Sequence, residues 1–269
     1  MQLIGNGIGI PFQRKVGGGF DPDYQAVLDY ATTQGYTLPS AGQQTLQNQL
    51  VVDLKTAGVW SKLDAFSVFA TDGDSDFALI DWVRLITQSA VSSPTFTSNE
   101  GYKGDGVSSY INTLYAPATD GVNYQLNSAS FGQYIFSDYD DNVGMGTRSA
   151  SPLQALTYPA GLGDIDIRVN ADILSGANIG ASSTELGLRH YNRSNNNTSS
   201  LYDSGGLVGS NSSVSGSLSA FDFYLFCLNN GNTPAGFTSQ NVSFVFFGGD
   251  LSAENAVFNT ALTTYINAI

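Results

Sequence analysis

A chain of 269 residues is long enough to bury a substantial core, and with only 12% charged residues and 30 glycines it does not resemble a helical bundle. The composition is typical of short strands joined by polar turns. The net charge of −13, with ten lysines and arginines against 23 acidic residues, argues against nucleic acid or an anionic membrane as the partner.

The first twenty residues predict an extended arm in which apolar side chains alternate with glycines. The apolar members are Leu3, Ile4, Ile8, Ile10 and Phe12, and a glycine triplet follows at 17–19. Such an arm can insert into another subunit or add an edge strand to its own sheet, and the sequence leaves both open. Its charges follow the apolar run, unlike those of a signal peptide, so we expect synthesis in a cytoplasm.

A helical section with a hairpin is predicted over residues 21–90. Asp21 can cap a helix that begins at Pro22, and a second helix from about Ser40 stops at Gly58. Two strands, 63–70 and 77–85, are then expected around an aspartate-rich turn.

That turn contains Asp72, Asp74 and Asp76 at the first, third and fifth positions of an EF-hand-like loop. The loop also needs Gly at its sixth position and Glu at its twelfth, where Phe77 and Val83 stand. A polar hairpin turn is therefore favoured over a cation site.

From residue 91 the sequence alternates strand and turn patterns until a closing helix that Ser252 can cap. We therefore predict a mainly β sandwich with an N-terminal helical section and a C-terminal helix. The predicted division is a docking arm (1–20), a helical assembly or packing region (21–90) and the sandwich with its terminal helix (91–269). Cys227, the only cysteine, lies in an apolar run and is expected to be a buried, inert thiol.

Two segments carry a resemblance to a known family. The stretch 101–136 contains "GVSSYINT", and 242–269 contains "VSFVFFGGDLSAEN" before the last helix. Together they resemble the concanavalin A-like lectin/glucanase jelly rolls. With the helical section included, the chain is similar to fibre and appendage proteins of tailed phages of Bacteroidota-type bacteria. That resemblance implies a virion protein, a homotrimer and contact with host surface glycan.

The strand "GDIDIRVN" (163–170) is where glucanases of this fold carry their catalytic carboxylates. By that resemblance Asp164 would stand at the nucleophile position and Asp166 at the middle position, but Arg168 or Val169 at the acid/base position. An arginine cannot donate a proton at neutral pH, and hydrolysis needs a protonated carboxyl beside the nucleophile. We therefore expect a solvent-facing strand and no enzyme activity.

Polar loops between Tyr191 and Ser217 have the composition of adaptable binding surfaces. The glycan-contact hypothesis covers Arg189, Tyr191, Asn192, Arg193 and Tyr202, and the alternative is a pair of hairpin loops without a ligand. Three clustered carboxylates, Asp138, Asp140 and Asp141, are the candidate Ca²⁺ ligands, and Ca²⁺ is the only cofactor that the sequence suggests. His190, the one histidine, cannot form a histidine cluster for zinc.

The prediction from the sequence is thus a non-enzymatic virion protein (fibre, tail appendage or capsid-attached) that contacts host glycan. Its partners would be other virion proteins, bound through the arm, with no membrane insertion and no nucleic acid. Two alternatives remain: a purely architectural capsid or tail component without a ligand, and a glycan-degrading hydrolase.

Overall fold

The structure is a computed structural model of the whole chain, and it describes residues 19–137, 144–148, 156–160, 164–171, 179 and 186–269. Five α-helices and a short 3₁₀ helix occur in the described part. They are α1 (Pro22–Gln34), α2 (Ala41–Thr56), η1 (Trp60–Lys62), α3 (Ser75–Ala78), α4 (Pro117–Asp120) and α5 (Asn255–Ile266).

The described strands form two sheets. The larger sheet has the strand order β14 (Gly206–Asn211), β13 (Thr198–Asp203), β12 (Gly187–Asn195), β8 (Ala129–Ser137), β18 (Asn241–Gly248), β1 (Leu63–Val68), β2 (Ile80–Asp81) and β3 (Ile86–Thr87). In the same sheet, β6 (Gly101–Lys103) pairs with β18, and β5 (Thr95–Thr97) pairs with β6. The smaller has the order β11 (Asp164–Arg168), β10 (Leu156–Ala160), β9 (Met145–Arg148), β15 (Tyr224–Leu225), β7 (Tyr110–Asn112) and β4 (Ser89–Val91), with β16 (Leu228–Asn230) beside β9 and β17 (Pro234–Ala235) beside β16.

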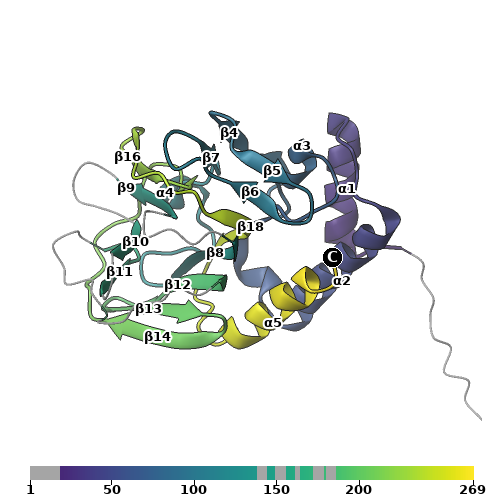
Figure 1. Cartoon of the computed structure of the whole chain (residues 1–269). Helices are drawn as coiled ribbons and strands as arrows, with labels where there is room; N and C mark the ends of the chain where they lie inside the picture. Colours follow the sequence, from purple (N-terminus) through teal and green to yellow (C-terminus); the bar gives the residue numbers. More distant parts are fainter. Residues whose placement is uncertain (1–18, 138–143, 149–155, 161–163, 172–178, 180–185) are drawn as a thin grey trace, which may run out of the picture.

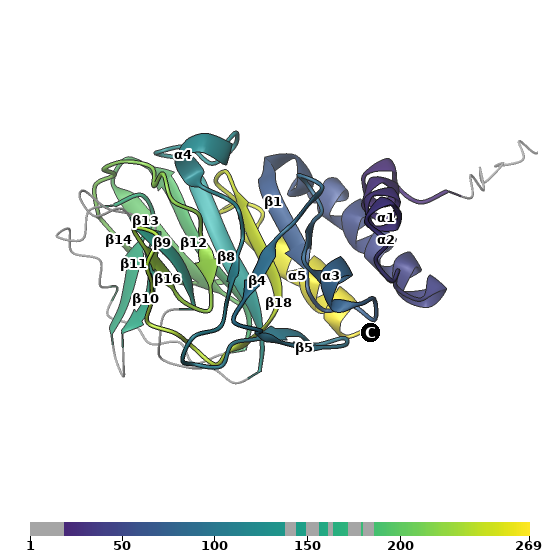
Figure 2. The ribbon, with the colours of Figure 1, turned by 90° about the horizontal axis from the view of Figure 1, so that it is seen from above.

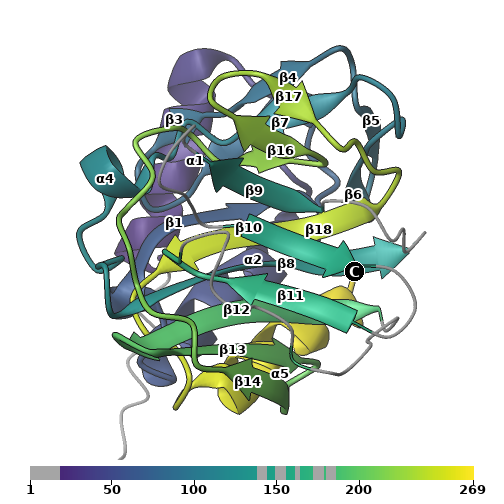
Figure 3. The same ribbon diagram turned by 90° about the vertical axis from the view of Figure 1, so that its left-hand side faces the viewer.

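The molecule has three layers, which Figure 1 and Figure 2 show from two sides: the smaller sheet, the larger sheet, and helices α1, α2 and α5. Figure 3 faces the smaller sheet, with β9, β10 and β11 in front of the larger one. This is the mainly β sandwich with helical sections at both ends that the sequence predicts.

Strand β18 lies between the two hydrophobic cores of the protein. All eight of its residues are buried, because one face lies against the helices and the other against the smaller sheet. Phe244 and Phe246 belong to the core under the helices, with Phe66, Trp82, Phe258 and other buried residues. Val245 and Phe247 belong to the core between the sheets, where Phe247 stacks on Tyr115.

The two N-terminal helices begin as predicted. The Asp21 side chain accepts a hydrogen bond from the Asp23 backbone N–H, Pro22 occupies the first turn, and Gly35 ends α1 at φ 79°. Ser40 caps α2 through the Gln43 N–H. No helix in the described ranges is long and apolar enough to cross a membrane.

Two local predictions need correction. The segment 77–85 is not one strand, because the Asp74 side chain caps the Phe77 N–H and starts helix α3, which leaves only the two-residue strand β2. The terminal helix starts at Asn255 rather than after a Ser252 cap. The Asp250 side chain accepts from the Ser252 backbone N–H, so residue 252 lies in the turn before the helix.

Candidate functional site

The residues of the sequence-based glycan hypothesis lie on β12 and β13, where most of them are buried. Arg189, with a side chain 2% exposed, pairs with Asp203 at 3.3 Å. Tyr191 points into the core between the sheets and stacks on Phe131, with ring centroids 5.3 Å apart. These two side chains therefore hold strands together instead of facing a ligand.

Asn192 and Arg193 are also used inside the protein. Asn192 donates to Asp250 at 2.8 Å and accepts from the Leu251 backbone N–H at 3.0 Å. The buried Arg193 guanidinium donates to the carbonyl oxygens of Val169 and Ser213, and burial lowers the pKa of Arg193 to about 10.

Tyr202, the fifth member, is half-buried and stacks on His190. We therefore correct the glycan hypothesis for this group, because its donors and rings are already used by the fold.

Other predicted site residues fall outside the described part. The arm residues Leu3, Ile4, Ile8, Ile10 and Phe12 and the candidate Ca²⁺ ligands Asp138, Asp140 and Asp141 lie there. Asp164 and Asp166 lie on β11, where they pair with Ala160 and Tyr158 of the neighbouring strand β10. Among the residues that the structure describes, no group of three or more His, Cys, Asp or Glu side chains could hold a metal ion.

The aspartates of the EF-hand-like turn have a structural role. Asp72 accepts from the Ser40 backbone N–H at 2.9 Å, and Asp74 accepts from the Thr37 backbone N–H at 2.6 Å. Both bonds tie the turn to the loop between α1 and α2. The interpretation of this segment as a polar turn agrees with these contacts.

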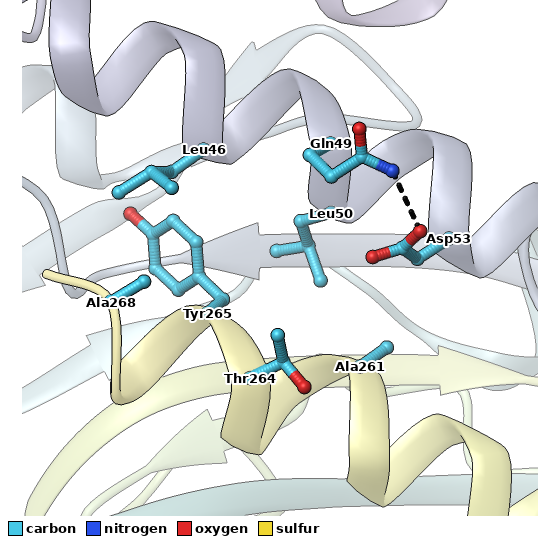
Figure 4. A pocket seen from close by; sticks show the side chains of 8 residues that line it. All are labelled: Leu46, Gln49, Leu50, Asp53, Ala261, Thr264, Tyr265 and Ala268. Carbon is cyan, nitrogen blue, oxygen red and sulfur yellow. Dashed lines mark hydrogen bonds between the residues drawn. The ribbon is translucent and has the colours of Figure 1, made fainter.

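Three hollows in the described part are candidate sites, and the first is a notch between α2 and α5. In Figure 4, Leu46 and Leu50 of α2 face Ala261 and Tyr265 of α5, while Gln49 donates to Asp53 at the rim. The volume is about 50 Å³, which is room for only a few water molecules at about 10–15 Å³ each. This notch is too small for a sugar ring.

The second hollow, of about 330 Å³, lies between the ends of β8 and β12 and helix α5. Tyr134, Leu186, Ser204 and Asn259 are among its lining residues, and Asn259 donates to the Ser204 carbonyl oxygen at 3.1 Å. Its lining residues Phe136 and Leu186 stand close in the sequence to segments outside the described ranges. We assign no site to it.

The third hollow, of about 270 Å³, has a lining that is described throughout. We call it the tryptophan hollow; it is lined by Asp23, Ala26, Trp60, Trp82, Val83 and Leu85. The chain has two tryptophans, and both are here. Helix α1, η1 and the turn between β2 and β3 bring these residues together from segments far apart in the sequence.

The geometry of the tryptophan hollow is set by a carboxylate. Asp23 Oδ2 accepts from Trp60 Nε1 at 2.8 Å and lies 2.7 Å from Lys55 Nζ. The Asp23 side chain remains 47% exposed. Trp60 also meets Phe66 edge-on, at 6.1 Å between centroids. The indole is therefore held in one orientation beside an accessible carboxylate.

Trp82 forms the inner wall of the hollow and is 1% exposed. Its ring packs between Tyr24 and Phe66, with centroids at 5.4 and 6.0 Å. Its Nε1 is buried and has no hydrogen-bond partner in the described part of the chain. Trp82 thus supplies a rigid apolar wall, and Trp60 supplies the more exposed aromatic surface.

The charges beside the hollow are coupled through Lys55, which bridges Asp21 at 2.5 Å and Asp23 at 2.7 Å. Burial favours the neutral form of Asp21, but the hydrogen bond from Lys55 and the backbone bonds outweigh it and lower the pKa of Asp21. Burial likewise opposes the charge of Lys55, but the bonds to both aspartates outweigh it and raise the pKa of Lys55. Both shifts favour the charged forms of Asp21 and Lys55.

The tryptophan hollow was not among the sites predicted from the sequence. Some of the lining residues follow the sequence pattern of a helix surface and others that of a buried core, so no motif in the sequence identifies the hollow. The one signal in the sequence is composition, because both tryptophans precede residue 91, whereas the predicted binding loops belong to the sandwich.

Comparisons with known proteins bear on the fold. No protein-family model matches the chain, and a search of curated proteins found no relative. A mutant of Trypanosoma rangeli sialidase that displays trans-sialidase activity is similar in structure, with a TM-score of 0.55 and 12% identity over 84% of this chain and 40% of that chain. The same sialidase in complex with 2,3-difluoro-KDN gives a TM-score of 0.50 and 12% identity over 82% of this chain and 39% of that chain.

A further similar structure is domain 4 of a GH43 extracellular arabinanase from Geobacillus stearothermophilus, in complex with arabinotriose. Its TM-score is 0.41, with 12% identity over 74% of this chain and 98% of that chain, which is too low to support an argument. The chain spans about 40% of the length of the sialidases that it matches.

These comparisons support the resemblance to a concanavalin A-like jelly roll at the level of the β-sandwich fold. They overturn the expected function. The prediction of a non-enzymatic phage virion protein was wrong, because the solved structures that share the fold are sialidases, which are glycan-processing enzymes. Of the functions predicted from the sequence, the alternative of a glycan-degrading hydrolase fits these findings better.

Proposed function

We propose that this chain takes part in glycan processing and binds a glycan in the tryptophan hollow. The observation that carries the proposal is the Trp60 indole, fixed by Asp23 beside a hollow of about 270 Å³. Sugar rings present apolar C–H faces that pack on indole surfaces and hydroxyls that donate to carboxylates. Val83, Leu85 and Ala26 add apolar surface around the aromatic ring.

The fold supports the same proposal at a coarser level. The sialidases that share it are named for the cleavage of a sugar, and this chain covers only part of their length. Binding of the glycan and cleavage of the glycan are therefore separate questions for this chain, and each has its own experiment.

Binding is tested by titrating the full chain with oligosaccharides while following tryptophan fluorescence. Because both tryptophans line the hollow, the emission reports directly on its occupancy. The probes are arabinotriose, cellohexaose, maltohexaose, lactose and 3′-sialyllactose. We expect saturable binding of at least one probe and a loss of affinity of about tenfold or more in Trp60→Ala, as for buried aromatic anchors at other binding sites.

The matched control is Tyr202→Ala, which removes a half-buried aromatic from β13. Its affinity should equal that of the wild type, and thermal melting should show that both variants are folded. If no probe changes the fluorescence, or if Trp60→Ala binds as the wild type does, the hollow is not the glycan site.

A second candidate function is hydrolysis by this chain itself, and the register of β11 favours it. Asp164 and Asp166 lie two residues apart on this edge strand, paired with Ala160 and Tyr158 of β10. Retaining hydrolysis needs two carboxyl groups about 5–5.5 Å apart. Release of reducing ends from a polysaccharide that the chain binds, lost in Asp164→Asn and retained in Asp29→Asn, would support it; no release by the wild type would refute it.

A further inference from the structure

The polar groups of the tryptophan hollow suit a neutral ligand better than an acidic one. Asp23 Oδ2 receives both Trp60 Nε1 and Lys55 Nζ, whereas Oδ1 accepts no hydrogen bond within the described part of the chain. A carboxylate oxygen can only accept, so a ligand group that contacts Oδ1 favourably has to be a hydrogen-bond donor. A sugar hydroxyl is such a donor, and a ligand carboxylate is not.

The cations around the hollow are already paired. Lys55 lies between Asp21 and Asp23, which leaves a local charge of about −1 from one ammonium and two carboxylates. Arg84 follows the lining residue Val83, but its guanidinium pairs with Asp81 at 2.6 Å and donates to the carbonyl oxygens of Thr113 and Leu114. Among the described residues around the hollow, an acidic sugar would therefore meet negative charge and no unpaired cation.

The net charge of the whole chain also disfavours the binding of an acidic sugar. With 23 acidic residues against ten lysines and arginines, an anionic glycan is repelled at long range as well as in the hollow. The apolar surfaces of Trp60, Val83 and Leu85 accept a sugar ring regardless of its charge.

We infer that the tryptophan hollow takes a neutral saccharide unit in preference to a carboxylated one, and that Asp23 sets this preference. The inference rests on the proposed function, since it concerns the specificity of the same site. It separates this chain from the sialidases that share its fold, whose name refers to an acidic sugar.

The test compares matched neutral and acidic ligands: lactose with 3′-sialyllactose, which adds one acidic sugar, and methyl-esterified with free oligogalacturonate, which differ at every carboxyl group. Affinities of the full chain are measured from tryptophan fluorescence in low and in physiological salt. We expect the neutral member of the bound pair to bind about tenfold more tightly, which corresponds to ~1.4 kcal/mol. Raising the salt concentration should narrow this difference because it screens the repulsion.

Asp23→Asn keeps the shape of the side chain and removes its charge, so we expect it to reduce the preference several-fold. The control Asp29→Asn removes a charge from the exposed face of the same helix, where Asp29 contacts Gln25, and should leave the preference unchanged. Thermal melting confirms that each variant is folded.

The two ways of failing are distinct. Equal or tighter binding of the acidic member, still lost in Trp60→Ala, would overturn this inference and keep the glycan site. An unchanged preference in Asp23→Asn would also overturn it. Absence of binding to every probe, neutral or acidic, would overturn the proposed function itself.

Discussion

His190 is a single residue whose environment controls its protonation. It lies on β12, fully buried, stacked on Tyr202 and edge-on to Phe246. Its Nδ1 lies 3.0 Å from Asn255 Oδ1 on α5, whereas Nε2 has no partner in the described part of the chain. Desolvation lowers the pKa of His190 to about 4, despite the hydrogen bond to Asn255, which acts in the opposite direction.

Stability should therefore fall on mild acidification. Between pH 7 and pH 5 the unfolded chain binds a proton at its only histidine while the folded chain does not, because the folded pKa is the lower one. The free energy of unfolding should drop by ~2 kcal/mol over this range. The measurement is urea denaturation at pH 7, 6 and 5.

The matched variant for that measurement is His190→Gln, which keeps a hydrogen-bonding group near Asn255 but cannot titrate. Its stability curve should be flatter by about the same amount over the same pH range. Parallel curves for the variant and the wild type would show that His190 is not the responsible group.

At the scale of elements, β8 depends on a glycine in the middle of the larger sheet. Gly132 lies opposite His190 on β12 and opposite Phe246 on β18, and these two rings meet with centroids 5.5 Å apart. A Cβ atom at Gly132 would lie 2.2 Å from the Arg189 carbonyl oxygen and 2.6 Å from the Phe246 ring. The central strands can approach only because no side chain stands there.

Gly132→Ala should consequently destabilise the protein by ~1–3 kcal/mol or more, since both neighbours are buried and cannot move aside. Gly206→Ala on β14 is the control, because its nearest neighbour, the Asp203 carbonyl oxygen, would lie 3.6 Å away. The control should change the free energy of unfolding by less than ~0.5 kcal/mol. Equal effects of both variants in urea denaturation would contradict this account.

Local sequence rules predicted some of these elements correctly and one of them wrongly. The caps of α1 and α2 were predictable because Asp21, Pro22 and Ser40 act on residues within one turn. The segment 77–85 was not, because an apolar run fits both a strand and a buried turn. There the Asp74 side chain accepts from the Phe77 N–H and from the distant Thr37 N–H, and these two bonds stabilise a helix.

At the scale of the whole molecule, the charge of −13 is spread over a chain with few cations to balance it. Within the described residues, the ion pairs that involve lysine or arginine use Lys55, Lys62, Arg84 and Arg189. The excess of carboxylates repels itself in the compact state more than in the expanded unfolded state.

Added salt should therefore stabilise this protein. Between 20 and 300 mM sodium chloride at pH 7, screening of the repulsion should raise the melting temperature by a few degrees, about 2–4 °C for each kcal/mol. Calorimetry or circular dichroism measures the shift. A melting temperature that falls with salt would mean that the ion pairs outweigh the net repulsion.

The amino-acid sequence by itself determined the fold class, the two N-terminal helices and the burial of Cys227, because propensity, capping and alternation act between near neighbours. Only the tertiary structure decided which polar residues are accessible. Arg193 looked like a loop residue but is fully buried, since its guanidinium meets the Val169 and Ser213 carbonyl oxygens. Trp60 and Trp82 meet beside Asp23 only after α1, η1 and the β2–β3 turn have packed, and contacts between such distant segments leave no local pattern in the sequence.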